Sequence, residues 1–149
     1  MQRKHEERAF LDTLALLYPE FPDGRIIPSE SPDFIIRSGK KHTTGIEVTL
    51  LTKKEYNWLE GKALHFLPSL SRDHLVEMIR YKEEKIGLYR SKKLNEIWLL
   101  IIAKGLSNPA HFNITNQLEN WHIDSSFDRV LLIELKRNRL VEVYRDPNS

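Results

Sequence analysis

The chain contains no cysteine and no long apolar run, and each absence excludes whole classes of protein. Without cysteine there is no disulfide scaffold, no thiol nucleophile, no iron–sulfur cluster and no cysteine-based zinc site. The longest apolar stretch, residues 97–103, is far shorter than the roughly 20 residues that span a bilayer. The N-terminal residues also lack the apolar segment of a signal peptide. We therefore expect a cytoplasmic protein that does not contact a membrane.

An excess of one charge is also missing, because 23 lysines and arginines face 21 aspartates and glutamates, which leaves a formal net charge of +2. A balance this even does not by itself indicate a nucleic-acid-binding protein, so such a function depends on where the charges lie. The six histidines show no HExxH spacing, and the chain has no GxGxxG, GxxxxGK[ST] or GxSxG motif. A histidine-based zinc site, a nucleotide cofactor and serine hydrolysis are thus disfavoured.

The chain does contain a regular succession of helical and extended patterns. Apolar residues at helical spacing predict helices over 6–18, starting a few residues earlier, and over 71–90. Strands are predicted over 31–37, 44–51, 96–103, 129–135 and 140–144, a loop over 52–71 and a short helix over 113–119. This order predicts one α/β domain over residues 1–149, with a mixed sheet flanked by helices and a frayed tail at about 146–149. The near-continuous apolar strand 96–103 is expected to be central and parallel to a neighbour.

Two acidic residues, Asp33 and Glu47, are predicted to face each other across the first hairpin. They are opposite each other if the turn is centred on Lys40, and a shift of the turn would change the partners. Cβ atoms of such a pair lie roughly 4.5–5.5 Å apart, so two carboxylates repel unless a cation compensates them. Mg²⁺ prefers oxygen ligands of this kind, and the carbonyl of Val48 would add a third. In the alternative interpretation, Asp33 is a turn residue and Glu47 a solvated strand residue.

A lysine on the apolar face of the second helix is the other unusual feature. At about 100° per residue, Lys82 falls near Leu75 on the inward face, whereas Lys85 lies on the flank. A buried ammonium is costly unless it is paired, so carboxylates beneath this helix would explain its position. Alternatively, the stem of Lys82 packs inward while its ammonium reaches water. A similar projection places Glu7 on the inward face of the first helix, with Glu6 at the edge of that face.

This arrangement resembles the PD-(D/E)xK nuclease superfamily. The resemblance lies in Pro32-Asp33, a gap of 13 residues and then Glu47-Val48-Thr49 on an apolar strand, between a glutamate-bearing and a lysine-bearing helix. It covers about residues 6–103 and implies a restriction-endonuclease-like αβββαβ core. One departure stands out, because the family pattern has a lysine where this chain has Thr49. Either the chain is inactive, or the lysine has migrated to the following helix, as it has in some branches of the superfamily.

The resemblance implies a metal-dependent nuclease that hydrolyses phosphodiester bonds, with DNA as the favoured substrate and RNA as the alternative. Asp33, Glu47 and the Val48 carbonyl would bind Mg²⁺, with Mn²⁺ as a substitute. Lys82, or failing that Lys85, would orient or activate water, and Glu7 or Glu6 would be the accessory acid. A homodimer is expected, since many small members pair to cut two strands. The alternative is an inactive module of the same fold that binds nucleic acid or protein.

Basic residues near the predicted strands and along the second helix are candidates for binding a phosphate backbone. They are Lys40, Lys41, Lys53, Lys54, Arg80, Lys92 and Lys93. In the alternative interpretation these cations belong to ordinary solvated faces of the helix and the hairpin.

Overall fold

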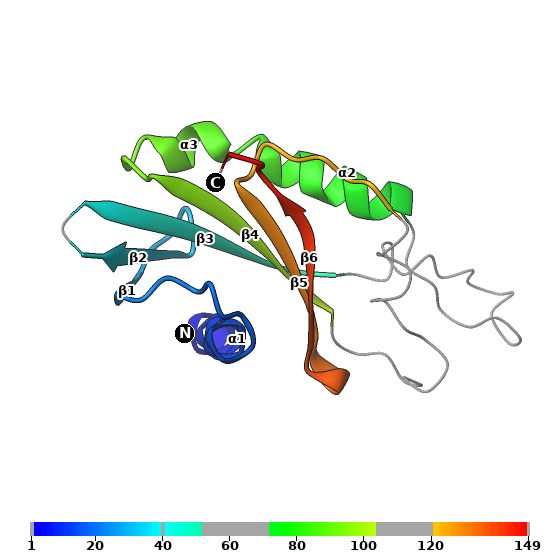
Figure 1. Cartoon of the computed structure of the whole chain (residues 1–149), viewed down its shortest axis with the longest axis horizontal. Coiled ribbons are helices and arrows are strands. Elements are labelled where there is room, and N and C mark those ends of the chain that lie inside the picture. Colours follow the sequence, from blue (N-terminus) through cyan, green and yellow to red (C-terminus); the bar gives the residue numbers. More distant parts are fainter. Residues whose placement is uncertain (1, 40, 52–71, 104–120, 149) are drawn as a thin grey trace, which may run out of the picture.

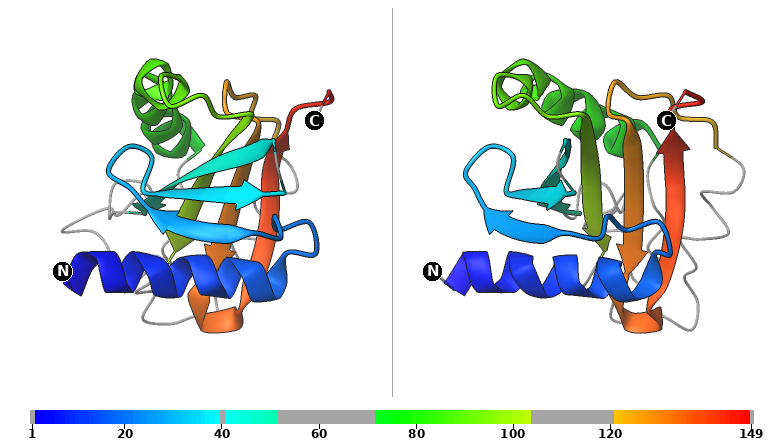
Figure 2. Two further views of the ribbon diagram at one scale, coloured as in Figure 1. Left: turned by 90° about the vertical axis from the view of Figure 1, so that its left-hand side faces the viewer. Right: turned by 60° about the vertical axis from the view of Figure 1, so that its left-hand side comes forward.

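The computed structural model describes residues 2–39, 41–51, 72–103 and 121–148. In this part of the chain, one six-stranded mixed sheet lies between helices on both faces (Figure 1 and Figure 2). Helix α1 (Gln2–Leu17) covers one face, and helices α2 (Arg72–Glu83) and α3 (Ile86–Arg90) cover the other. The predicted α/β class, with a mixed sheet flanked by helices, is confirmed.

The strands follow one another across the sheet in the order of the sequence. They are β1 (Arg25–Pro28), β2 (Phe34–Ser38), β3 (His42–Leu50), β4 (Glu96–Ala103), β5 (Arg129–Glu134) and β6 (Arg139–Arg145). Strands β1, β2 and β3 pair antiparallel, β4 is parallel to both β3 and β5, and β6 returns antiparallel to β5. The prediction that residues 96–103 form a central strand parallel to a neighbour is confirmed.

The first hairpin has the predicted register. Phe34 pairs with Ile46 at one end of the ladder and Ser38 with His42 at the other, and Gly39 in the turn adopts a φ of 62°. A left-handed backbone of this kind favours glycine, which places the turn at this point of the chain. Continued by one residue beyond Phe34, the same register brings Asp33 opposite Glu47.

A close approach at Gly45 fixes where the chain enters β2. A Cβ atom on Gly45 would lie 2.7 Å from Cγ of Pro32 and 2.6 Å from Cδ1 of Leu94, closer than atoms can pack. The absence of a side chain therefore lets the ring of Pro32 lie against β3. Because Asp33 follows Pro32 directly, this contact also positions the Asp33 carboxylate at the edge of β3.

The core consists of two layers, one on each face of the sheet. Alternate residues of a strand point to opposite faces, so Trp98 and Leu100 of β4 pack against the α1 layer, while Ile97 and Leu99 pack against the α2 and α3 layer. Seven of the eight residues of β4 are buried, because helices cover both faces above it. Alternate residues of β3 therefore point to different helices: those on one face point toward α1, and those on the other face point toward α2 and α3.

Two predictions about the elements were wrong. Strand β1 was not expected, because its four residues are too few to show a period and it ends in Pro28 at the edge of the sheet. The predicted helix 71–90 is divided into α2 and α3 at Glu84–Lys85. There the amide of Lys85 bonds the carbonyl of Lys82, three residues back, which closes a tighter turn than an α-helix has. The predictions for 52–71 and 113–119 lie outside the described residues.

Candidate metal centre

The site forms at the edge of β3 beyond Ile46. This edge is not paired with β2, because β2 begins only at Phe34, opposite Ile46. At this edge the amide of Val48 donates to Oδ2 of Asp33 at 2.8 Å, so a carboxylate takes the place of a partner strand. The N–H and C=O groups of one strand residue point to the same side of the strand. The carbonyl of Val48 therefore points toward the same edge as Asp33, as a third oxygen ligand would need to.

Glu47 and Lys82 meet on the face of the sheet that α2 covers. Nζ of Lys82 donates to Oε2 of Glu47 at 3.2 Å, and the two side chains are 17% and 8% exposed. The inward projection of Lys82 is thus confirmed, and its ammonium is held by a carboxylate instead of reaching freely into water. The ammonium of Lys85, by contrast, lies 5.5 Å from the centroid of the Tyr81 ring. Of the two candidate lysines, Lys82 is the one that the structure brings to Glu47.

The environment of Glu47 opposes its negative charge. Burial raises the pKa of Glu47, the neighbouring charge of Asp33 raises it further, and the ammonium of Lys82 partly offsets both effects. Two unit charges about 5 Å apart repel by roughly 3 kcal/mol at an effective dielectric constant near 20. The ammonium of Lys82 offsets these effects only in part, so the pKa of Glu47 stays above its ordinary value.

Helix α1 brings a second lysine to the site from the other face of the sheet. Nζ of Lys4 donates to the carbonyls of Ser29 at 2.9 Å and of Asp33 at 3.3 Å. The same ammonium lies 3.2 Å from Oε1 of Glu7 and 3.6 Å from Oδ1 of Asp33. Sequence reasoning missed Lys4, although it shares a helical stripe with Glu7 and Leu11 that the spacing could have revealed.

Glu7 occupies the predicted inward position on α1. Its side chain is 9% exposed and lies 3.6 Å from Nε of Arg3 as well as near Lys4. Glu6, predicted at the edge of that face, is exposed. Lys4 thus links Glu7 to Asp33, and the structure brings together three predicted acids and one predicted lysine.

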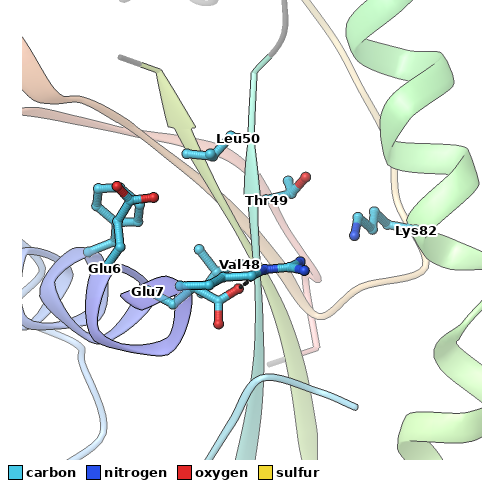
Figure 3. Close-up of a pocket in the computed structure, with 8 residues that line it drawn as sticks. Glu6, Glu7, Val48, Thr49, Leu50 and Lys82 are labelled. Carbon is cyan, nitrogen blue, oxygen red and sulfur yellow. Dashed lines mark ion pairs between the residues drawn. The ribbon is translucent and has the colours of Figure 1, made fainter. Parts of the chain in front are cut away.

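A cavity of about 370 Å³ opens next to these groups, between α1, the end of β3 and α2. Figure 3 shows Glu6 and Glu7 approaching from α1, Lys82 from α2 on the opposite side, and Val48, Thr49 and Leu50 between them. The volume of this cavity lies at the lower end of the range found for small-molecule binding sites. The described residues that line it are Arg3, Glu6, Glu7, Phe10, Val48, Thr49, Leu50 and Lys82.

The residues present fit a divalent cation of the Mg²⁺ type. Among the described residues there is no cluster of three or more aspartate, glutamate, histidine or cysteine side chains that would form a site by itself. Mg²⁺, however, is usually held by only one or two carboxylates and keeps several waters. Asp33, Glu47 and the Val48 carbonyl supply such a set. An ion binding there would compete with the ammonium groups of Lys4 and Lys82 for the same oxygens.

Those predicted basic residues that the structure describes do not gather at one place. Arg80 is engaged within the fold, because it bonds Glu83 and the carbonyl of Asp124, both at 2.8 Å. Lys92 donates to Oγ of Ser29 at 2.8 Å, close to the loop that Lys4 holds. Lys41 and Lys93 lie elsewhere, beside a second cavity of about 230 Å³ at the turn of the first hairpin. Lys40, Lys53 and Lys54 lie outside the described residues.

Comparisons with models of protein families, with curated proteins and with solved structures found no match to this chain. Among the helices of the described ranges, none has the length and apolar character of a membrane-crossing helix. What the chain does is therefore inferred from the chemistry of the residues that converge at the edge of β3.

Proposed function

We propose that the chain is a metal-dependent nuclease domain of the PD-(D/E)xK type, which hydrolyses phosphodiester bonds. The observation that carries this proposal is the contact between Lys82 and Glu47, made beside Asp33 at the open edge of β3. In this proposal Asp33, Glu47 and the carbonyl of Val48 hold Mg²⁺, and Mn²⁺ can substitute for it. The antiparallel β1–β2–β3 segment between α1 and α2 supports the αβββαβ core that the sequence resemblance implies.

The proposed roles follow from the charges and positions of the side chains. A bound divalent cation polarises a phosphoryl oxygen and lowers the pKa of a bound water. Lys82 supplies a positive charge beside Glu47, where it can orient the attacking water and stabilise negative charge developing on the phosphate. Glu7 pairs with Lys4 and balances part of the charge of the ammonium beside Asp33, whose carboxylate the amide of Val48 holds at the edge of β3.

The distribution of cations supports a long, charged substrate such as DNA. The second cavity includes Arg37, Lys41 and Lys93, and His42 in the same cavity lies five residues before Glu47 on β3. Val48, which lines the first cavity, is six residues from His42 on β3, and at about 3.3 Å per residue this is ~20 Å, a span of about six nucleotides along one strand of DNA. A backbone that enters the first cavity could therefore also reach these cations. Because this spacing suits either nucleic acid, our choice of DNA, with RNA as the alternative, rests on the sequence resemblance.

A non-catalytic module of the same fold is the second candidate, and specific observations favour it. Thr49 stands where the family pattern has its lysine, and both Lys4 and Lys82 already contact the acids that would bind the metal. If these ammonium groups are permanent counter-charges, the acids serve stability alone. The module would then bind nucleic acid or protein without cutting.

Cleavage of supercoiled plasmid DNA in the presence of Mg²⁺ or Mn²⁺ tests the proposal. We expect nicking by the purified protein, loss of nicking in Glu47→Ala and Lys82→Ala, and full activity in Glu77→Ala, an exposed glutamate on α2. Loss in Lys85→Ala with retention in Lys82→Ala would show that the lysine has been assigned wrongly. Retained cleavage in both Glu47→Ala and Lys82→Ala would indicate a contaminant or another site. An arm with single-stranded RNA tests the preference for DNA.

Calorimetric titration with Mn²⁺ separates the enzyme from the non-catalytic module. The enzyme requires saturable binding that Glu47→Ala removes and Glu77→Ala leaves intact. No binding at millimolar Mn²⁺ would refute the metal centre and favour the second candidate. We also propose a homodimer, an assembly suited to cutting two strands, and sedimentation equilibrium of the free protein and of its DNA complex tests it.

A further inference from the structure

Within the described residues, a tyrosine hydroxyl near the proposed metal centre has no well-formed hydrogen bond. Tyr89 of α3 is fully buried, and its hydroxyl is enclosed without a partner among the described residues. A buried hydroxyl that makes no hydrogen bond costs free energy, so it is usually paired or reserved for a ligand-bound state. A phenylalanine would fill the same space without this cost. The hydroxyl therefore needs an explanation that packing does not give.

Tyr89 lies on the same face of the sheet as Glu47. It packs in the layer that contains Leu99, and Leu99 is the neighbour of Glu47 in the pairing of β3 with β4. A tyrosine hydroxyl carries its proton at neutral pH, and the negative charges of Glu47 and Asp33 act on the hydroxyl of Tyr89. The protonated hydroxyl thus lies close to the Glu47 carboxylate without forming a well-aligned hydrogen bond to it.

We infer that Tyr89 is a positioning residue whose hydroxyl donates a hydrogen bond to the Glu47 carboxylate once that carboxylate has turned to bind the metal ion. In the structure, Oε2 of Glu47 accepts from Lys82. An ion at the edge of β3 draws one carboxylate oxygen toward Asp33, and the other oxygen then needs a donor on the side of α3. Carboxylates that bind metals are themselves held by hydrogen bonds, and loss of such a partner typically weakens metal binding 10–100-fold.

This inference rests on the proposed metal centre, and its test is metal affinity instead of cleavage. The variant is Tyr89→Phe, which removes one oxygen and keeps the ring that fills the core. The matched control is Tyr81→Phe, at a tyrosine of α2 that is 60% exposed. For each protein we measure the midpoint of thermal unfolding without metal, the affinity for Mn²⁺ by calorimetry, and the tyrosine absorbance change on adding Mg²⁺.

We expect Tyr89→Phe to unfold at the wild-type temperature or above it without metal, because the hydroxyl has no partner there. Its affinity for Mn²⁺ should fall about tenfold or more, and the tyrosine absorbance change seen in the wild type should disappear. Tyr81→Phe should match the wild type in all three measurements.

Two results would overturn the inference while leaving the metal centre standing. One is an unchanged Mn²⁺ affinity in Tyr89→Phe beside a wild type that binds Mn²⁺. The other is a lower unfolding temperature of metal-free Tyr89→Phe, which would show that the hydroxyl is already bonded in the resting fold. Failure of the wild type itself to bind Mn²⁺ would instead refute the metal centre, and with it the role of Tyr89.

Discussion

Replacing Lys82 by methionine tests the electrostatics of the site most directly. Methionine keeps a long apolar stem but removes the ammonium that contacts Glu47 at 3.2 Å. Glu47 is then left buried, 6% exposed, beside the like charge of Asp33. The variant therefore isolates the question of whether Lys82 neutralises Glu47 or merely packs against it.

The expected magnitude follows from the burial of the pair. Breaking a fully buried ion pair by removing one partner costs about 3–5 kcal/mol. Because the side chain of Lys82 remains 17% exposed, water can partly replace the ammonium, and we expect a loss of about 2–3 kcal/mol. In a protein of this size that corresponds to a fall of roughly 4–12 °C in the unfolding midpoint.

Two further variants make the measurement specific. Lys85→Met removes an ammonium that lies over the Tyr81 ring, so it should cost less than about 1 kcal/mol. The double variant Lys82→Met/Glu47→Gln removes both charges, and it should regain most of the stability lost in Lys82→Met.

The assay is urea unfolding at neutral pH, followed by circular dichroism, with and without Mn²⁺. An ion that binds only the folded protein stabilises it, so Mn²⁺ should restore part of the stability of Lys82→Met. The reasoning is refuted if Lys82→Met lies within about 0.5 kcal/mol of the wild type, or if the double variant is no more stable than Lys82→Met.

Three more predictions follow from the same contacts. Gly45→Ala should lower the free energy of unfolding by about 2 kcal/mol and weaken Mn²⁺ binding, because the new Cβ would displace Pro32. The control Gly87→Ala has open space around the new Cβ and should not destabilise the protein. Equal effects of the two variants in calorimetry would contradict this prediction. Lys4→Met should lower stability but tighten Mn²⁺ binding about fivefold, because a competing charge near Asp33 is gone; weaker binding would count against it. Burial alone would raise the pKa of Glu83, but hydrogen bonds from Ser125, Ser126 and Arg80 outweigh it and hold that pKa below its ordinary value. This lowered pKa stabilises the fold above the ordinary glutamate pKa, and the stabilisation is lost as the pH falls through the folded-state pKa. Glu83→Gln should therefore cost about 1–2 kcal/mol at pH 7 and progressively less as the pH falls below the ordinary glutamate pKa; a pH-independent difference in urea unfolding would contradict this explanation.

Much of the fold was predictable because it depends on short-range patterns. The register of the first hairpin follows from a turn that Gly39 permits, and that register alone places Asp33 opposite Glu47. The helical period is equally local, and it put Lys82 and Glu7 on the inward faces of α2 and α1 before any contact was known.

Other parts of the site depend on the residue at which β2 begins, and the spacing of apolar residues in the sequence does not predict that residue. Because β2 starts only at Phe34, the edge of β3 at Val48 is open, and side chains from both faces of the sheet meet there. Lys4 reaches Asp33 from 29 residues away in the chain, through a contact that exists only once α1 is packed on the sheet.

The sequence by itself determined the α/β class, the hairpin register and the inward direction of Lys82, since each follows from periodicity or turn chemistry within short segments. Only the tertiary structure decided the division between α2 and α3, the addition of β1, the choice of Lys82 over Lys85 and the unpaired hydroxyl of Tyr89. The physical reason is that these features depend on how layers distant in the chain pack together, and packing fixes positions that local preferences leave open.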